Sequence, residues 1–178
     1  EQSYFKQMAI REAAQRCGPS AALQAARHLG RDARPLVSVI VPTHNRPQQL
    51  KRAITSVQSQ TYDNIEIIVV NDGSADDTLD RLMGAFDLVA TPRVATSEIP
   101  TERIRTVYRS RLHPSLWVID KANGGKSDAL NAGINYSRYP LVCAMDADTL
   151  LENDALIRIV RPFLEDQRTV AAGGIIRI

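Results

Sequence analysis

The chain has little cysteine, no excess of charge of either sign and no long apolar run. Cys17 and Cys143 are its only cysteines among 178 residues, which is too few for a disulfide framework. Cys143 lies inside an apolar run, where a cysteine usually serves as a small buried hydrophobe. A reducing compartment is therefore the simplest assumption.

The charge balance gives no sign of a nucleic-acid partner. The 22 Lys and Arg residues nearly match the 20 Asp and Glu residues, whereas a nucleic-acid surface needs a basic excess. Four arginines cluster without interleaved aromatic residues, which favours a solvated basic stretch. They are Arg103, Arg105, Arg109 and Arg111. No apolar run reaches the ~18 residues of a membrane span, and no secretory signal is present.

The length is that of one domain with a sizeable core. Residues 1–35 are expected to form a helical extension and linker, with a helix over 4–29 that breaks at Gly18-Pro19. Residues 36–178 are expected to form the main domain. Because the chain starts at Glu1 and stops within a strand-like run, we expect it to be a piece of a longer protein.

Apolar runs alternate with helical patterns in the main domain. Such alternation predicts an α/β fold with a mostly parallel, Rossmann-like sheet. Strands are predicted at 36–41, 65–70, 104–108, 116–119, 141–145 and 170–178, and helices at 47–60, 76–84, 126–136 and 153–164. Residues 86–111 are the least regular and resemble an insertion.

Four polar clusters directly follow predicted strands. They are residues 42–46, 71–78, 120–127 and 146–149. Ligands bind beyond the carboxyl ends of the strands in open parallel sheets. We therefore expect the four clusters to share one crevice.

The first cluster leads into a helix start, whose free backbone amides favour an anion or a polar ring. A turn capped by Thr43 or Asn45 explains the same residues. His44 is expected to be a solvated loop side chain.

The second cluster begins with Asp72, which closes a strand, and Gly73, which permits a tight turn. The Asp72 carboxylate can accept a hydrogen bond from a ring N–H or a ribose hydroxyl. Turn and cap chemistry, with Ser74 or Asp76 as the helix cap, remains the alternative.

The third cluster contains Gly124-Gly125, which lets the backbone approach a ligand, and then Lys126 at a helix start. A positive side chain beside a helix N-terminus suits a diphosphate. The spacing matches neither a nucleotide-hydrolase phosphate loop nor the dinucleotide fingerprint. Lys121 is a second candidate, although a surface lysine is the simpler interpretation.

The fourth cluster, Asp146-Ala147-Asp148, follows a strand that is predicted to be buried. Two carboxylates there can hold a hard divalent ion, which can in turn hold a diphosphate. Mg²⁺ or Mn²⁺ suits oxygen ligands, whereas Zn²⁺ would favour His or Cys. An acidic turn is the alternative.

Taken together, the four motifs resemble those of family 2 glycosyltransferases with the GT-A fold. The resemblance covers residues 36–178. Val118-Ile119-Asp120-Lys121 leading into Asn123-Gly124-Gly125-Lys126 is most similar to the membrane-bound hyaluronan, cellulose and poly-N-acetylglucosamine synthases.

The resemblance implies a site for a UDP-sugar donor with Mg²⁺ or Mn²⁺ as the cofactor. Asp72 matches the family's acid at the uracil, Lys126 the lysine near the phosphates, and Asp148 the metal ligand. Asp146 matches the acid near the ribose and the metal. The implied nucleotide-sugar residues are Pro42, Thr43, Asn45, Arg46, Asp72, Gly73, Gly125, Lys126, Asp146 and Ala147, and the implied metal ligands are Asp148 and Asp146.

The resemblance further implies inverting transfer to a saccharide acceptor, in polysaccharide synthesis at the cytoplasmic face of the plasma (inner) membrane. Membrane association is expected of the parent protein and is not encoded in this chain. The family's general-base aspartate is not visible before Ile178, so no catalytic residue is assigned. The acids Glu152, Asp154, Glu165 and Asp166 are expected to carry surface charge.

Two other interpretations compete with an enzyme that carries its donor site here. One is a nucleotide-sugar-binding module without transfer activity, because the acceptor and base half is absent. The other is an unrelated nucleotide-binding enzyme such as a dehydrogenase, against which the missing G-x-G-x-x-G argues.

Overall fold

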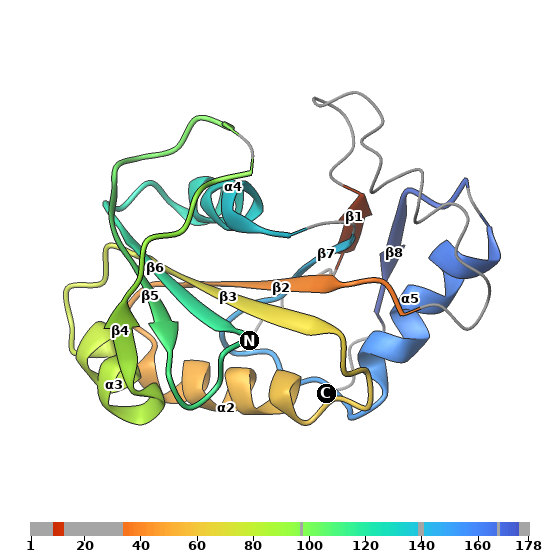
Figure 1. Cartoon of the computed structure of the whole chain (residues 1–178), viewed down its shortest axis with the longest axis horizontal. Helices are drawn as coiled ribbons and strands as arrows, with labels where there is room; N and C mark the ends of the chain where they lie inside the picture. The colour runs from red at the N-terminus through yellow and green to blue at the C-terminus, as the bar shows by residue number, and fades with distance from the viewer. Residues whose placement is uncertain (1–8, 13–33, 97, 139–140, 167, 175–178) are drawn as a thin grey trace, which may run out of the picture.

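The β-branched runs of the sequence form the middle of one twisted sheet (Figure 1). The computed structural model describes residues 9–12, 34–96, 98–138, 141–166 and 168–174. Its strands are β1 (Ala9–Glu12), β2 (Val37–Thr43), β3 (Ile65–Asp72), β4 (Leu88–Ala90), β5 (Ile104–Ser110), β6 (Leu116–Lys121), β7 (Leu141–Ala144) and β8 (Ala171–Gly173). Its helices are α2 (Pro47–Gln58), α3 (Thr78–Phe86), α4 (Lys126–Tyr136) and α5 (Ala155–Glu165).

The strand order is β4-β5-β6-β3-β2-β7-β1-β8. The four central strands, β6, β3, β2 and β7, are parallel to one another. β5 runs antiparallel to β6, since a parallel connection needs a crossover far longer than the five residues 111–115 between them. β1 is antiparallel to both β7 and β8. The predicted mostly parallel sheet is therefore confirmed, with antiparallel strands at both of its edges.

Alternate side chains of the central strands enter two separate cores. Val39 and Val41 of β2 pack with buried residues of α2, α3 and α5. Ile40, between them, packs with Ala129 and Ala132 of α4. Figure 1 shows α2 and α3 below the sheet and α4 above it. A side chain of this size contributes about 1.5–3 kcal/mol when fully buried, so the two cores fix the positions of the strand ends.

Helix α2 begins at Pro47, where a proline is tolerated because its missing N–H needs no partner. Its buried residues Leu50, Ala53, Ile54 and Val57 follow the i, i+3, i+4, i+7 spacing of one helix face. The structure thus orients α2 so that its first turn lies at the carboxyl end of β2.

The predicted elements of the main domain are present, with bounds that shift by a few residues. β3 runs to Asp72 and β6 to Lys121, two residues beyond the predicted ends. β4 was not predicted, because a strand of three residues is too short to show an alternation of apolar and polar side chains. The predicted strand at 170–178 is observed at Ala171–Gly173, and residues 175–178 lie outside the described residues.

The predicted N-terminal helix is wrong at Ala9–Glu12, which forms strand β1. Backbone pairing with β7 and β8 decides this segment, and a four-residue run gives little indication of such partners. The rest of the predicted helix, including Gly18-Pro19, falls outside the described residues. Within the described part of the chain, the helices are all too short or too polar to cross a membrane.

Candidate functional site

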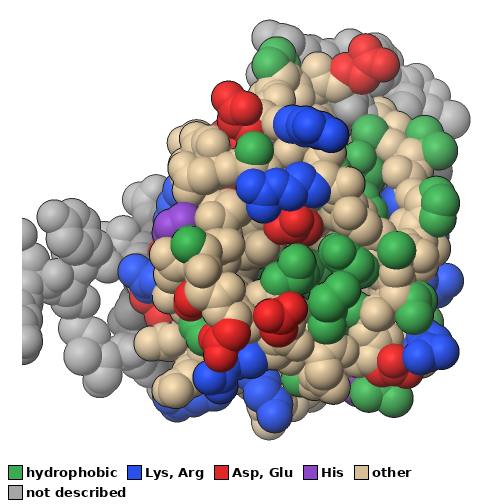
Figure 2. Space-filling view, turned by 90° about the vertical axis from the view of Figure 1, so that its left-hand side faces the viewer, with side chains coloured by type: hydrophobic (Ala, Val, Ile, Leu, Met, Phe, Trp, Pro, Cys, Tyr) green, Lys and Arg blue, Asp and Glu red, His purple; other side chains and the backbone are tan. Residues whose placement is uncertain are grey.

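Direct contacts join the four polar clusters at the carboxyl ends of β2, β3, β6 and β7. The Asn45 backbone N–H donates to Ser74 Oγ at 3.0 Å, and Asn45 Oδ1 accepts from the Ala75 N–H at 2.9 Å. These bonds connect the loops after β2 and β3. Figure 2 faces the edge of the molecule onto which these strands open, and basic and acidic side chains lie side by side near its middle.

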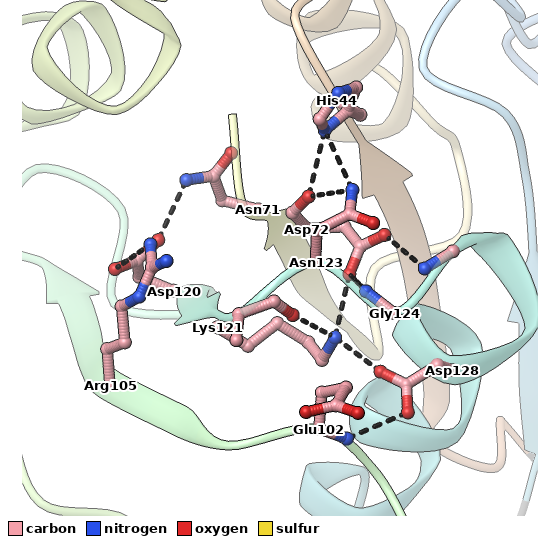
Figure 3. Close-up of polar contacts among 12 residues, drawn as sticks. His44, Asn71, Asp72, Glu102, Arg105, Asp120, Lys121, Asn123, Gly124 and Asp128 are labelled. Atoms are coloured by element: carbon pink, nitrogen blue, oxygen red, sulfur yellow. Dashed lines mark hydrogen bonds and ion pairs between the residues drawn. The ribbon is translucent and has the colours of Figure 1, made fainter. Parts of the chain in front are cut away.

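His44 connects three of the clusters (Figure 3). Its Nδ1 lies 2.8 Å from the Asp72 carbonyl oxygen, which fits an Nδ1–H donor. The Asn123 side-chain amide donates to the same carbonyl at 3.0 Å. His44 is exposed, as predicted, and it also ties the loops together. Gly73 has φ +66°, and a Cβ there would lie 2.7 Å from the Asn123 backbone nitrogen, so only glycine allows this close approach.

The Asp72 carboxylate is buried and holds the glycine loop. It accepts the backbone N–H groups of Gly124 at 3.0 Å and Gly125 at 2.8 Å. Lys121 Nζ donates to the same carboxylate at 2.7 Å. Asp72 is 4% exposed. In this structure the predicted uracil-contacting acid therefore positions the loop that leads to Lys126.

Lys121 is not the surface lysine that was expected: its side chain is 0% exposed. It is the last residue of β6, between β5 and β3, and its Nζ bridges the carboxylates of Asp72 and Asp128. Burial alone lowers the pKa of Lys121, but hydrogen bonds and charge attraction from Asp128 and Asp72 outweigh it and raise the pKa above its usual value. Nothing local in the sequence signals this burial.

Asp128 extends the network to the irregular segment. Its Oδ2 accepts the Glu102 backbone N–H at 2.8 Å, which attaches the irregular segment 86–111 to α4 at this residue. The same segment is held by Arg93, whose guanidinium pairs with buried Glu66 at 2.7 Å and lies 4.4 Å from the ring centre of Trp117. Trp117 is a core residue.

The acids of the fourth cluster form ion pairs with two other clusters. Asp148 Oδ2 lies 2.5 Å from Arg46 Nη1, and Asp146 Oδ1 lies 2.5 Å from Lys126 Nζ. The structure therefore brings together Arg46, Lys126 and both acids from three loops. Ala147, between the acids, is buried in the hydrophobic core. A metal role for these acids stays a prediction.

The donor set suits a partial metal site. Two carboxylates provide oxygen ligands of the kind that Mg²⁺ and Mn²⁺ prefer, with remaining positions left to water or phosphate. In the described ranges, no three or more His, Cys, Asp or Glu side chains gather in a way that could hold a metal. These residues fit an ion that completes its coordination with a ligand.

Two buried oxygens at the same strand ends have no hydrogen-bond partner in the structure: Thr43 Oγ1 and Asn71 Oδ1. Thr43 and Asn71 are register partners on β2 and β3. Thr43 was a predicted site residue, whereas Asn71 was noted only as part of its motif. An unpaired buried oxygen costs free energy, and both lie beside the predicted donor residues.

The alternative cap roles are partly correct. Asp76 Oδ1 accepts the Thr78 N–H at 3.0 Å and the Thr78 hydroxyl, and these bonds lower the pKa of Asp76. Ser74 bonds to the first cluster and not to a helix end. The later acids carry surface charge as predicted: Arg158 pairs with Asp154 and with Glu152.

The family model "Glycosyl transferase family 2" matches residues 38–95 and 96–178. Chondroitin synthase of Pasteurella multocida (strain Pm70) is 29% identical over 133 residues, which are 75% of this chain and 11% of that protein. Poly-beta-1,6-N-acetyl-D-glucosamine synthase of Staphylococcus epidermidis is 28% identical over 143 residues, 80% of this chain and 29% of that protein. The chain thus spans less than a third of either relative.

Solved structures share the fold. A mannosyltransferase of Pyrobaculum calidifontis, in complex with GDP-Man and Mn²⁺, matches with a TM-score of 0.57 and 24% identity over 74% of this chain and 33% of that chain. S. aureus TarS 1–349 in complex with UDP-GlcNAc matches with a TM-score of 0.51 and 21% identity, over 72% and 31% of the two chains.

These likenesses confirm the predicted α/β, GT-A fold and the resemblance drawn from the four motifs. Because the family model matches residues 38–178, which are more than half of the chain, the chain belongs to glycosyl transferase family 2.

Proposed function

We propose that this chain carries the donor site of a metal-dependent, inverting glycosyltransferase that uses a UDP-sugar and acts in polysaccharide synthesis. One observation carries the proposal: loops from four parallel strand ends meet, and three of these loops bring two acids and two cations into direct contact. The chondroitin and poly-N-acetylglucosamine synthases among the relatives support a polysaccharide product. The UDP-GlcNAc and GDP-Man complexes of the structural neighbours support a nucleotide-sugar donor.

In this proposal the loop after β2 and the end of β3 receive the uracil, with Pro42, Thr43, Asn45, Asp72 and Gly73 around it. The buried, unpaired Thr43 hydroxyl supports a polar ligand at this position. If Asp72 reads the base, its carboxylate must share or release bonds to the glycine loop.

The diphosphate lies between α4 and the Asp-x-Asp loop. Gly125 and Lys126 open α4, where the helix N-terminus favours negative charge. Arg46, at the N-cap position of α2, brings a second cation to the same place. Asp146 and Asp148 would hold a divalent ion, which would stabilise the charge that develops on the departing diphosphate.

Transfer itself is attack by an acceptor hydroxyl on the anomeric carbon of the sugar, opposite the diphosphate, which inverts that carbon. The C–O bond to the diphosphate breaks, and a general base takes the hydroxyl proton. No residue of the described chain is assigned to that base, which we expect beyond Ile178. The parent protein would act at the cytoplasmic face of the plasma membrane.

Binding and turnover test the proposal separately. We expect the 178-residue chain to bind UDP in the presence of Mn²⁺ by calorimetry and to transfer little or no sugar from UDP-GlcNAc. Asp148→Asn should weaken this metal-dependent binding at least tenfold, whereas Glu152→Gln, which removes the same charge near Arg158, should leave it within twofold. Equal effects of the two substitutions would refute the assignment of Asp148 as a metal ligand. Rapid sugar transfer by this chain would refute the proposal that the general base lies outside it.

A further inference from the structure

Each acid of the Asp-x-Asp loop is already neutralised by a cation from a different strand end. The pairs are Arg46 with Asp148 and Lys126 with Asp146, both at 2.5 Å. The cations are the exposed partners: the side chains of Arg46 and Lys126 are 53% and 63% exposed, against 26% and 16% for the acids. The acids are thus held by the fold, while the long basic side chains lie at the rim.

These two ion pairs disfavour the binding of a divalent ion without a diphosphate, and of a diphosphate without a divalent ion. A divalent ion meets two carboxylates whose charge is balanced, and two carboxylates fill only part of its coordination shell. A diphosphate meets two cations that are already paired. Binding both together replaces two internal ion pairs with metal–carboxylate and cation–phosphate contacts, so that every charge keeps a partner.

Resting on the proposed donor site, we propose that Arg46 and Lys126 are exchangeable counter-ions. They neutralise Asp148 and Asp146 in the free protein, and they move to phosphate oxygens when a divalent ion takes the carboxylates. Arg46 is at the N-cap of α2 and Lys126 is the first residue of α4. Side-chain rotation at these two helix starts suffices for the exchange, and both helices keep their packing.

The exchange makes metal and nucleotide bind cooperatively, and the coupling must be reciprocal. Calorimetry on the 178-residue chain with MnCl₂ alone, with UDP in EDTA, and with UDP in saturating Mn²⁺ measures it. We expect UDP to bind at least tenfold more tightly with Mn²⁺ than without it, after correction for Mn²⁺–UDP association in solution. A ratio below threefold would overturn the exchange.

A charge-removing variant gives the sharper test. Asp148→Asn releases Arg46, so this variant should bind UDP in EDTA three- to tenfold more tightly than the parent chain does. Glu152→Gln removes an equal charge close in sequence, and it should not change metal-free binding. If the two variants bind metal-free UDP equally, general charge attraction explains the result and the exchange is wrong.

The opposite substitution provides an independent readout. Arg46→Gln removes the cation of the Arg46–Asp148 ion pair, so Mn²⁺ alone should bind at least threefold more tightly, while UDP with Mn²⁺ should bind more weakly. Arg52→Gln, an exposed residue of α2, is the matched control and should change neither. Unchanged Mn²⁺ affinity in Arg46→Gln would overturn the exchange but not the donor site. Failure of the parent chain to bind UDP at any Mn²⁺ concentration would overturn both.

Discussion

Lys121 stabilises the buried side chains on which the candidate site is built. Its ammonium group is buried between Asp72 and Asp128. Asp72 in turn accepts the two glycine amides that lead to Lys126. Because a buried carboxylate without a partner is costly, the lysine stabilises both acids and the loop they hold.

Replacing Lys121 with Met should lower the free energy of unfolding by roughly 3–5 kcal/mol, since it leaves two carboxylates without their cation. Urea denaturation measures the change. Lys51→Met, on the exposed side of α2, is the control and should stay within about 0.5 kcal/mol. A loss below about 1 kcal/mol for Lys121→Met would contradict this role.

The stabilisation that Lys121 provides has a defined pH dependence. The folded pKa of Lys121 is raised above its ordinary value. The contribution of the Lys121 ammonium group to folding stability is therefore fully present below the unfolded pKa near 10.4. It disappears only as the pH rises through the folded pKa. The stability difference between the parent chain and Lys121→Met should thus be constant from pH 7 to 9.

At the scale of whole elements, two helical glycines have opposite surroundings. A Cβ on Gly133 of α4 would lie 2.3 Å from Ile40 Cγ2 of β2. A Cβ on Gly84 of α3 would meet no atom within 4 Å. Gly133 thus permits α4 to pack closely on the sheet, whereas Gly84 has no such role in packing.

We expect Gly133→Ala to destabilise the protein by about 1–3 kcal/mol, because the methyl group overpacks the contact with Ile40. Gly84→Ala should stabilise it by about 0.4–1 kcal/mol through helix propensity and a less flexible unfolded chain. Thermal or urea unfolding of both variants tests the pair. If both substitutions changed the free energy of unfolding in the same direction, Gly133 would not be required for the close packing of α4 on β2.

The elements that the sequence predicted are those with a local cause. Runs such as 37–41 and 65–70 are rich in β-branched residues, and Pro47 marks a helix start, so neither prediction needs knowledge of neighbouring elements. β1 and the antiparallel direction of β5 could not be predicted in this way, because partners distant in the chain determine them. For the candidate site, the sequence predicted the four polar clusters, but it did not predict the ion pairs between them.

For the molecule as a whole, Cys143 reports the integrity of the sheet. It lies on β7, opposite Val39 of β2, and is fully buried. Burial raises the pKa of its thiol to about 12. The folded protein therefore keeps Cys143 protonated, and reaction with a thiol reagent requires the sheet to open.

In a Cys17→Ser variant, the remaining thiol should react with a disulfide reagent at pH 8 only as fast as the protein unfolds. Since the unfolded thiol titrates near pH 8.5–9 and the folded one near 12, this thiol should reduce stability progressively between those pH values. Denaturant-dependent labelling rates and unfolding curves at pH 8 and 10 test this. Fast labelling of the native protein would place Cys143 at an accessible position.

The residues that we propose for the donor site can be identified from the linear order alone, because each follows its own strand within a few positions. How they meet depends on folding: Arg46 and Asp148 are 102 residues apart in the chain and form an ion pair only because β2 and β7 are neighbours. The burial of Lys121 likewise depends on β6 lying between β5 and β3. Strand order sets such contacts, and no local pattern of side chains encodes it.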